Sequence, residues 1–213
     1  MDQQRPSESR ATLVLAGVCA TAVIALAVLL LLQPRQQPAP PPTWEALAPP
    51  PEVRLHPWRW IVIHHSDTAG GSVDSIDRVH RRERGWDGIG YHAVVGNGDP
   101  LPLGYVEATS RWRTQSPGAH AGSATAQAPY NRDGIGVCLI GAFAAAPPDE
   151  LQLQRTAELC AILIRQHPTL AIERIIGHRD VPGKRTECPG QISIERLRLL
   201  TRQAMERQGW PVR

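Results

Sequence analysis

The segment at residues 175–190, IIGHRDVPGKRTECPG, constrains the fold of this chain more than any other. It has one imidazole, His178, ten residues before one thiol, Cys188, with a Pro-Gly turn between them. A loop of that length can fold back and bring both side chains to one point. Neutral imidazole and thiolate are preferred ligands of zinc. Because two ligands do not make a site, the fold must bring in a third from elsewhere in the chain.

The best candidate for the third ligand is His64, which follows the apolar run WIVI at residues 60–63. Such a run is typical of a strand that is buried on both faces. Two imidazoles and one thiolate leave a zinc ion with a net charge near +1 and an open fourth position, which is the pattern of a catalytic zinc. Such an ion lowers the pKa of water toward about 7 and polarises a carbonyl oxygen. This chemistry suits the hydrolysis of an unactivated amide.

Other interpretations of the same residues stay open. His64 and His178 could be hydrogen-bonded structural histidines, and Cys188 could be an inert or disulfide-bonded thiol. A cysteine hydrolase that uses Cys188 and His178 would need no metal. A zinc peptidase has little support, because the chain has no H-E-x-x-H motif.

Strand-like and helix-like patterns alternate along the expected globular domain, residues 58–213. Short apolar runs predict strands at residues 60–64, 91–96, 136–141 and 173–177, and a turn signal at Asn97-Gly98 adds a hairpin partner at residues 102–107. Helical spacing predicts three helices, which begin at Asp74 or Ser75, at residues 147–149 and at Ser193. This alternation predicts an α/β fold, with helices flanking a central mixed β-sheet. Residues 111–133, rich in Gly, Ala, Ser and Pro, predict a long surface loop of the kind that often carries function.

The chain before the domain reads as three parts. Residues 1–10 form a short polar tail, and residues 11–32 contain no charged side chain. At about 1.5 Å per residue, a helix of that length spans a hydrocarbon core of about 30 Å. We favour an uncleaved transmembrane anchor over a signal peptide, because Gln33-Pro34-Arg35 is a poor cleavage site. Residues 33–57 are dense in proline and predict an extended, semi-rigid linker.

Charge and cysteine content exclude some functions. The net charge is +3 without a basic block, so we expect no nucleic-acid partner. Four cysteines are too few and too scattered for a disulfide framework. A bridge between Cys138 and Cys160 and two buried free thiols are both compatible with the sequence.

Five pieces of the domain, taken in order, resemble one known family. They are IVIHHS at 61–66, GWDGIGYH at 85–92, GAHAG at 118–122, YNRDGIGVCLIG at 130–141, and GHRDVPG with TECPG at 177–190. In these pieces the domain is similar to the zinc-dependent N-acetylmuramoyl-L-alanine amidases, the group that includes phage lysozyme-type amidases and peptidoglycan recognition proteins. Each piece alone is a weak signal, but five in the family's order are specific.

The resemblance implies roles for individual residues. His64, His178 and Cys188 match the family's zinc ligands, and Tyr91 matches a tyrosine directed at the substrate carbonyl or the attacking water. Thr186 stands where some relatives have lysine and the recognition proteins often have threonine. Cys138 stands where some relatives have a glutamate that carries protons, which leaves the general base open between the water on zinc and Tyr91.

A second set of residues is expected to line the substrate groove. His120 resembles a groove histidine of the family. We expect Trp112, Asn131 and Arg111, with the neighbouring Arg113, to line the same groove and to meet carboxylates of the stem peptide.

The implied reaction hydrolyses the amide between the lactyl group of N-acetylmuramic acid and L-alanine in peptidoglycan, with Zn²⁺ as cofactor. The main alternative is a non-catalytic peptidoglycan-binding module of the same fold. Because peptidoglycan lies outside the inner membrane, we expect a single-pass inner-membrane protein with a periplasmic catalytic domain, acting as a monomer.

Overall fold

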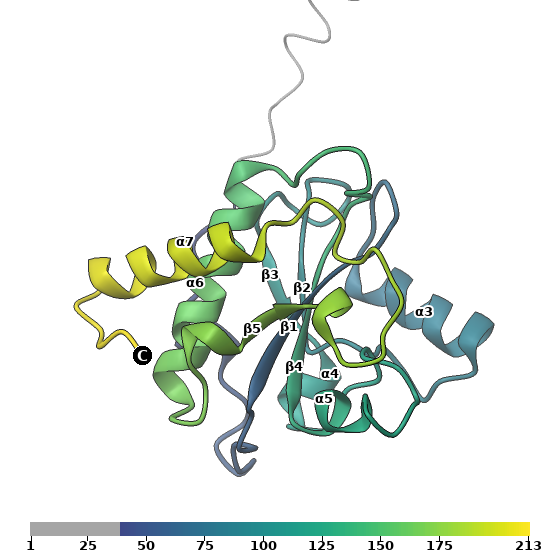
Figure 1. Ribbon diagram of the computed structural model, residues 1–213, viewed down its shortest axis with the longest axis horizontal. Coiled ribbons are helices and arrows are strands. Elements are labelled where there is room, and N and C mark those ends of the chain that lie inside the picture. The colour runs from purple at the N-terminus through teal and green to yellow at the C-terminus, as the bar shows by residue number, and fades with distance from the viewer. Residues whose placement is uncertain (1–38) are drawn as a thin grey trace, which may run out of the picture. The chain divides into compact units, whose positions relative to one another are not determined.

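The strands of this protein form a single mixed sheet in the order β3-β2-β4-β1-β5 (Figure 1). We describe a computed structural model, and the structure describes residues 39–213. β2 pairs with β4, β4 with β1, and β1 with β5, all in parallel, whereas β3 is antiparallel to β2. The strands are β1 (Trp60–His65), β2 (Ala93–Val95), β3 (Val106–Ala108), β4 (Gly134–Leu139) and β5 (Ile175–Gly177). The expected α/β fold with a mixed sheet is confirmed.

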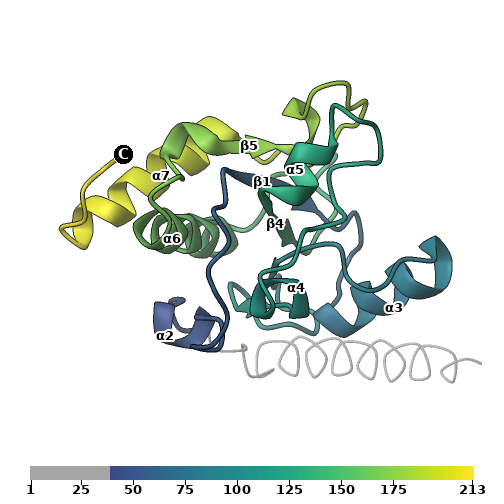
Figure 2. The same cartoon turned by 90° about the horizontal axis from the view of Figure 1, so that it is seen from below.

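Helices cover both faces of this sheet. α6 (Glu150–Gln166) and α7 (Ile194–Arg207) lie together on one side, and α3 (Val73–Arg84) lies on the other, as both views show (Figures 1 and 2). The shorter helical elements are α2 (Trp44–Leu47), α4 (Ser110–Arg113), α5 (Ala128–Arg132), η1 (Ile172–Arg174) and η2 (His178–Asp180).

The alternation of side chains along β1 and β4 separates a core face from a second face. Ile61, Ile63 and the odd-numbered residues of β4 join the main apolar core, together with Leu153 of α6 and Leu197 of α7. The second face carries His64, and Cys138 is its register partner on β4. Gly134 and Gly136 share that face, so β4 presents only small side chains there.

The three long helices begin at side-chain caps. Asp149 accepts a hydrogen bond from the Leu151 amide at the start of α6, and Ser193 accepts one from Arg196 at the start of α7. The first residue of α3 lies slightly before the expected one, because Ser72 is the cap and Ser75 is its reciprocal partner. Gly85 ends α3 in the left-handed conformation, with a φ of 66°.

The segment at residues 111–133 differs from the expected surface loop. It contains α5 and most of α4, and it buries both Trp112 and His120. The reason is packing that a local pattern does not reveal, since Trp112 joins the main core and His120 lies against β4.

The proline-dense segment also differs from an extended linker over its described part, residues 39–57. Ala39 and Leu47 are buried. The Trp112 Nε1–H donates to the Leu47 carbonyl at 2.6 Å, and Arg113 donates to the Ala48 carbonyl at 2.8 Å. Buried apolar groups and satisfied carbonyls hold this segment on the domain.

The expected localisation is corrected. Within residues 39–213, no helix has the length and apolar character needed to cross a bilayer. The polar tail at residues 1–10 and the apolar segment at residues 11–32, on which a single-pass inner-membrane location rested, lie outside the described residues.

Candidate metal centre

Two histidines meet at the carboxyl ends of neighbouring parallel strands. His64 lies at the end of β1, and His178 follows directly after β5 as the first residue of η2. Ile63 pairs with Gly177, so the next residue of each strand emerges at the same edge of the sheet. The two ring centroids are 4.4 Å apart.

The loop after His178 folds back and brings Cys188 to the same edge. The Arg179 amide donates to the Cys188 carbonyl at 2.8 Å, and the Cys188 amide donates to the Thr186 hydroxyl oxygen at 3.2 Å. Asp180 closes the turn before the loop by accepting from the Gly177 amide at 2.8 Å. As a result, the Cys188 Sγ lies 3.8 Å from the His64 Nδ1.

The three side chains fit a tetrahedral metal ion. One donor atom from each of His64, His178 and Cys188 lies within 4.8 Å of the other two. Bonds of 2.0–2.3 Å to zinc put tetrahedral ligands about 3.3–3.8 Å apart, so small rotations close the set. The His178 Nε2 is buried and has no hydrogen-bond partner in the described part of the chain. An orphaned buried nitrogen is costly, and a metal ion would satisfy it.

The protonation states of these groups suit metal binding. Burial, reinforced by His120, holds the pKa of His64 well below its usual value. Burial, reinforced by the Lys184 charge, lowers the pKa of His178 to about 4. Both rings are therefore neutral at pH 7 and offer a lone pair. Burial raises the pKa of Cys188 to about 11, so the thiol needs a bound cation to become a thiolate.

A family model described as N-acetylmuramoyl-L-alanine amidase (Amidase_2) matches residues 54–191. The chain belongs to this amidase family. It is 30% identical to human N-acetylmuramoyl-L-alanine amidase over 164 residues, which cover 70% of this chain and 25% of that protein. The chain thus spans about a quarter of the length of the first curated relatives it matches.

Solved structures of the amidase family share the fold. Peptidoglycan recognition protein-LE, in complex with the monomeric peptidoglycan tracheal cytotoxin, is 26% identical, with a TM-score of 0.53, 79% of this chain covered and 90% of that chain. The amidase LysC from Clostridium intestinale URNW has a TM-score of 0.54 at 22% identity, with 73% and 87% covered, which shows similarity of fold alone.

Tyr91 and Cys138 lie beside His64 in this amidase-family site. The Tyr91 ring centroid is 5.1 Å from that of His64. Burial, followed by the nearby Cys138 and Cys188 sulfurs, raises the pKa of Tyr91 well above its usual value, so its hydroxyl is a donor. Cys138 and Cys160 are both free and buried. Burial raises the pKa of Cys138 as well, so a neutral thiol stands where some family members have a glutamate.

Thr186 lies within the loop that carries Cys188. Its oxygen accepts from the Cys188 amide, and its hydroxyl hydrogen remains free to donate. This position is compatible with the catalytic role expected for it, and it also stabilises the loop.

The residues expected in the substrate groove make internal contacts. His120 is 6% exposed and lies behind His64, with its Nδ1 3.1 Å from the His64 Nε2. The Asn131 Oδ1 accepts from the amides of His120 and Ala121 at 2.8 and 2.7 Å, which fixes this loop. Trp112 is 3% exposed and packs in the core under α2.

Arg111 likewise links two loops. It donates to the Ile89 carbonyl at 2.5 Å, to the Pro117 carbonyl at 2.7 Å and to Asp87 at 2.5 Å. These contacts occupy most of its guanidinium. The partners of these four side chains lie in other segments of the chain, and the sequence does not display them.

Lys184 is a site neighbour that sequence reasoning missed. Its ammonium lies 3.1 Å from the point that a Cβ on Gly122 would occupy, and it acts on the pKa of His178 more than any other charge. No acidic side chain forms an ion pair with it in residues 39–213. The available signal was that the chain's only lysine falls inside the His178–Cys188 loop.

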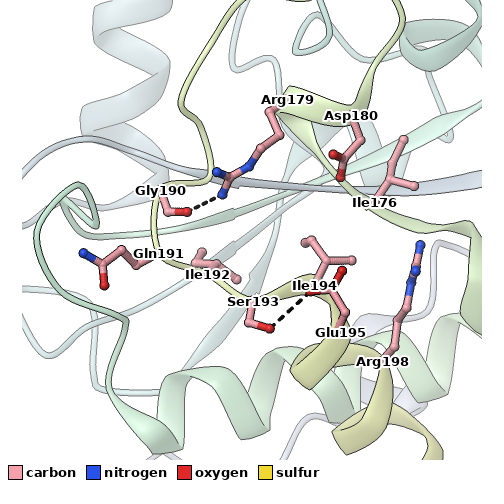
Figure 3. Close-up of a pocket in the computed structure, with 10 residues that line it drawn as sticks. All are labelled: Ile176, Arg179, Asp180, Gly190, Gln191, Ile192, Ser193, Ile194, Glu195 and Arg198. Atoms are coloured by element: carbon pink, nitrogen blue, oxygen red, sulfur yellow. Dashed lines mark hydrogen bonds between the residues drawn. The ribbon is translucent and has the colours of Figure 1, made fainter.

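A hollow of about 550 Å³ lies beside the same loop, between η2 and the start of α7 (Figure 3). Arg179 crosses its rim and donates to the Gly190 carbonyl. Arg198 lines it from α7 and donates to the Ile175 carbonyl at 2.7 Å, at the outer edge of β5. None of the three proposed metal ligands lines this hollow.

Proposed function

We propose that this domain is a zinc-dependent N-acetylmuramoyl-L-alanine amidase, which hydrolyses the amide between N-acetylmuramic acid and L-alanine in peptidoglycan. The observation that carries the proposal is the complete set of His64, His178 and Cys188, with the buried Nε2 of His178, which has no hydrogen-bond partner within residues 39–213. The amidase family and the peptidoglycan fragment bound by recognition protein-LE support the substrate class. We further propose that the functional unit extends beyond residues 58–213 to include the packed segment at residues 39–57.

The three ligands set the chemistry of the centre. When bound by His64, His178 and Cys188, zinc would polarise the substrate carbonyl and lower the pKa of water. The two neutral imidazoles add no charge, and the thiolate adds one negative charge, so the centre keeps a net charge near +1. Cys188 would bind the metal as a thiolate, after loss of its proton.

Tyr91 is the proposed donor to the reacting carbonyl. Its high pKa keeps the hydroxyl protonated at pH 7, so it can donate a hydrogen bond to the oxygen on which negative charge develops. Thr186 supplies a second, uncharged donor from the Cys188 loop. Cys138 does not serve as a general base, because its buried thiol keeps its proton.

The test is digestion of purified peptidoglycan, with mass spectrometry of the products. The full chain should release stem peptides that begin with L-alanine, and a chelator should stop this release. Cys188→Ala should lose both bound zinc and activity. Cys160→Ala is the matched control, since Cys160 lies on the buried face of α6 in the main core, away from the site, and it should retain both.

Two outcomes contradict the proposal in different ways. If the full chain binds peptidoglycan and zinc but releases no peptide, the domain is a binding module of the same fold. If activity persists in the chelator and is lost with thiol reagents, a cysteine hydrolase is the better description. The high pKa of Cys188 argues against the latter, because a protonated thiol is a poor nucleophile.

A further inference from the structure

His120 and His64 form a chain of hydrogen bonds that ends at the proposed metal. The His120 Nε2 lies 3.2 Å from the Gly134 carbonyl oxygen, and its Nδ1 lies 3.1 Å from the His64 Nε2. Both rings are nearly inaccessible, at 6% and 1% exposure. Neither nitrogen of His120 is therefore left for a substrate.

The direction of these hydrogen bonds follows from the Gly134 carbonyl. A carbonyl oxygen only accepts, so the His120 Nε2 carries the hydrogen. In the neutral ring the Nδ1 is then a lone-pair acceptor, and the His64 Nε2 must donate to it. This leaves a lone pair on the His64 Nδ1, the nitrogen that lies 3.8 Å from the Cys188 Sγ.

Neighbouring residues enclose the His120 ring tightly. A Cβ on Gly136 would lie 2.5 Å from the His120 Cδ2, and a Cβ on Gly118 would lie 2.4 Å from the same atom. Asn131 holds the backbone of His120 at the same time. Glycines on β4 and in the loop, together with one asparagine, thus fix a single ring.

We infer that His120 is a positioning residue, which sets the tautomer and the direction of the zinc ligand His64. The inference rests on the proposed function, because it assigns a partner to a ligand of that same centre. Histidine ligands of metals generally donate their second N–H to an outer partner, and losing that partner weakens metal binding about tenfold to a hundredfold. Here the partner is a neutral imidazole, which adds no charge to the centre.

The experiment compares zinc affinity in the full chain, measured by competition with a chromophoric chelator. His120→Leu removes the acceptor, so zinc should bind about tenfold to a hundredfold more weakly. His120→Asn should recover most of the affinity, because the amide Oδ1 can occupy the position of the Nδ1. His167→Leu is the matched control, a buried histidine outside the site, and its zinc affinity should stay at the wild-type value.

A second measurement does not depend on any variant folding. In metal-free wild-type protein labelled with ¹⁵N-histidine, NMR should show the His64 hydrogen on the Nε2. A hydrogen on the Nδ1 overturns the inference, as does wild-type zinc affinity in His120→Leu. A higher KM with unchanged zinc affinity assigns His120 to the substrate instead. If the wild type binds no zinc, the proposed function fails, while the NMR result still decides the role of His120.

Discussion

Gly136→Ala offers a direct test of the structural argument, because the strand leaves no space for a methyl group. The added Cβ would lie 2.5 Å from the His120 Cδ2, whereas ordinary contact begins near 3.4 Å, so the ring or the strand must move by roughly 1 Å. Overpacking of this kind costs about 1–3 kcal/mol of unfolding free energy. The His64 Nε2 and the His120 Nδ1 are 3.1 Å apart, so a displacement of the ring by that amount breaks the hydrogen bond between them.

We expect this variant to lose both stability and zinc affinity. Gly136→Ala should lower the free energy of unfolding in urea by about 1–3 kcal/mol and weaken zinc binding about tenfold or more. Ile135→Val is the matched control, because the neighbouring side chain faces the core on the other side of β4. That change should cost about 0.5–1.5 kcal/mol and leave zinc affinity unchanged.

The result that refutes the reasoning is a Gly136→Ala protein that loses stability but binds zinc like the wild type. It would mean that the position of His120 has no effect on His64. Equal loss of zinc affinity in both variants would instead show that affinity follows global stability alone.

Three further predictions follow from the site. Tyr91→Phe removes the hydroxyl donor and should lower kcat about 10²–10³-fold with zinc content unchanged, measured by peptide release and metal analysis; an unchanged kcat contradicts the role. Lys184→Met should raise the KM for peptidoglycan, because it removes a cation without an ion-pair partner in the described residues, and Arg185→Met, an exposed neighbour, is the control. The unfolding free energy of the metal-free protein should fall as pH decreases from 6.5 toward 4, since the folded-state pKa of His120, of His167 and of His178 is lowered to about 4; urea titrations that are flat over this range would contradict it.

The strand ends that carry the ligands are predictable from the sequence, because the relevant patterns are local. An apolar run before His64 and a short one before His178 indicate buried strands, and β1 and β5 lie at those positions. The caps at Asp149 and Ser193 follow from residue type in the same way. What brings the two histidines together is the pairing of β1 with β5, a contact across more than 100 residues that no local pattern specifies.

The groove residues show where sequence reasoning stops. Trp112 and Arg111 have the chemistry of substrate contacts, but backbone carbonyls of other segments already bind them. The partner of Trp112 is Leu47, in a proline-dense stretch that composition alone assigns to a linker. In both cases tertiary structure determines the partner of a donor group, and residue type reveals only that a partner is needed.

The alternating side chains of β4 face the apolar core on one side and the proposed metal site on the other. Its odd positions carry Ile135, Val137 and Leu139, which complete the core against α6. Its even positions carry the small residues Gly134, Gly136 and Cys138. The Gly134 carbonyl accepts a hydrogen bond from the His120 ring, and the absence of a side chain at Gly136 leaves space for that ring. A larger residue at Gly136 would crowd the ring that directs His64, whereas one at Gly134 would meet the backbone of Tyr130 in α5. The alternation GIGVCL therefore has two separable functions, and substitutions on the two faces of one strand should divide into effects on stability alone and effects on the metal.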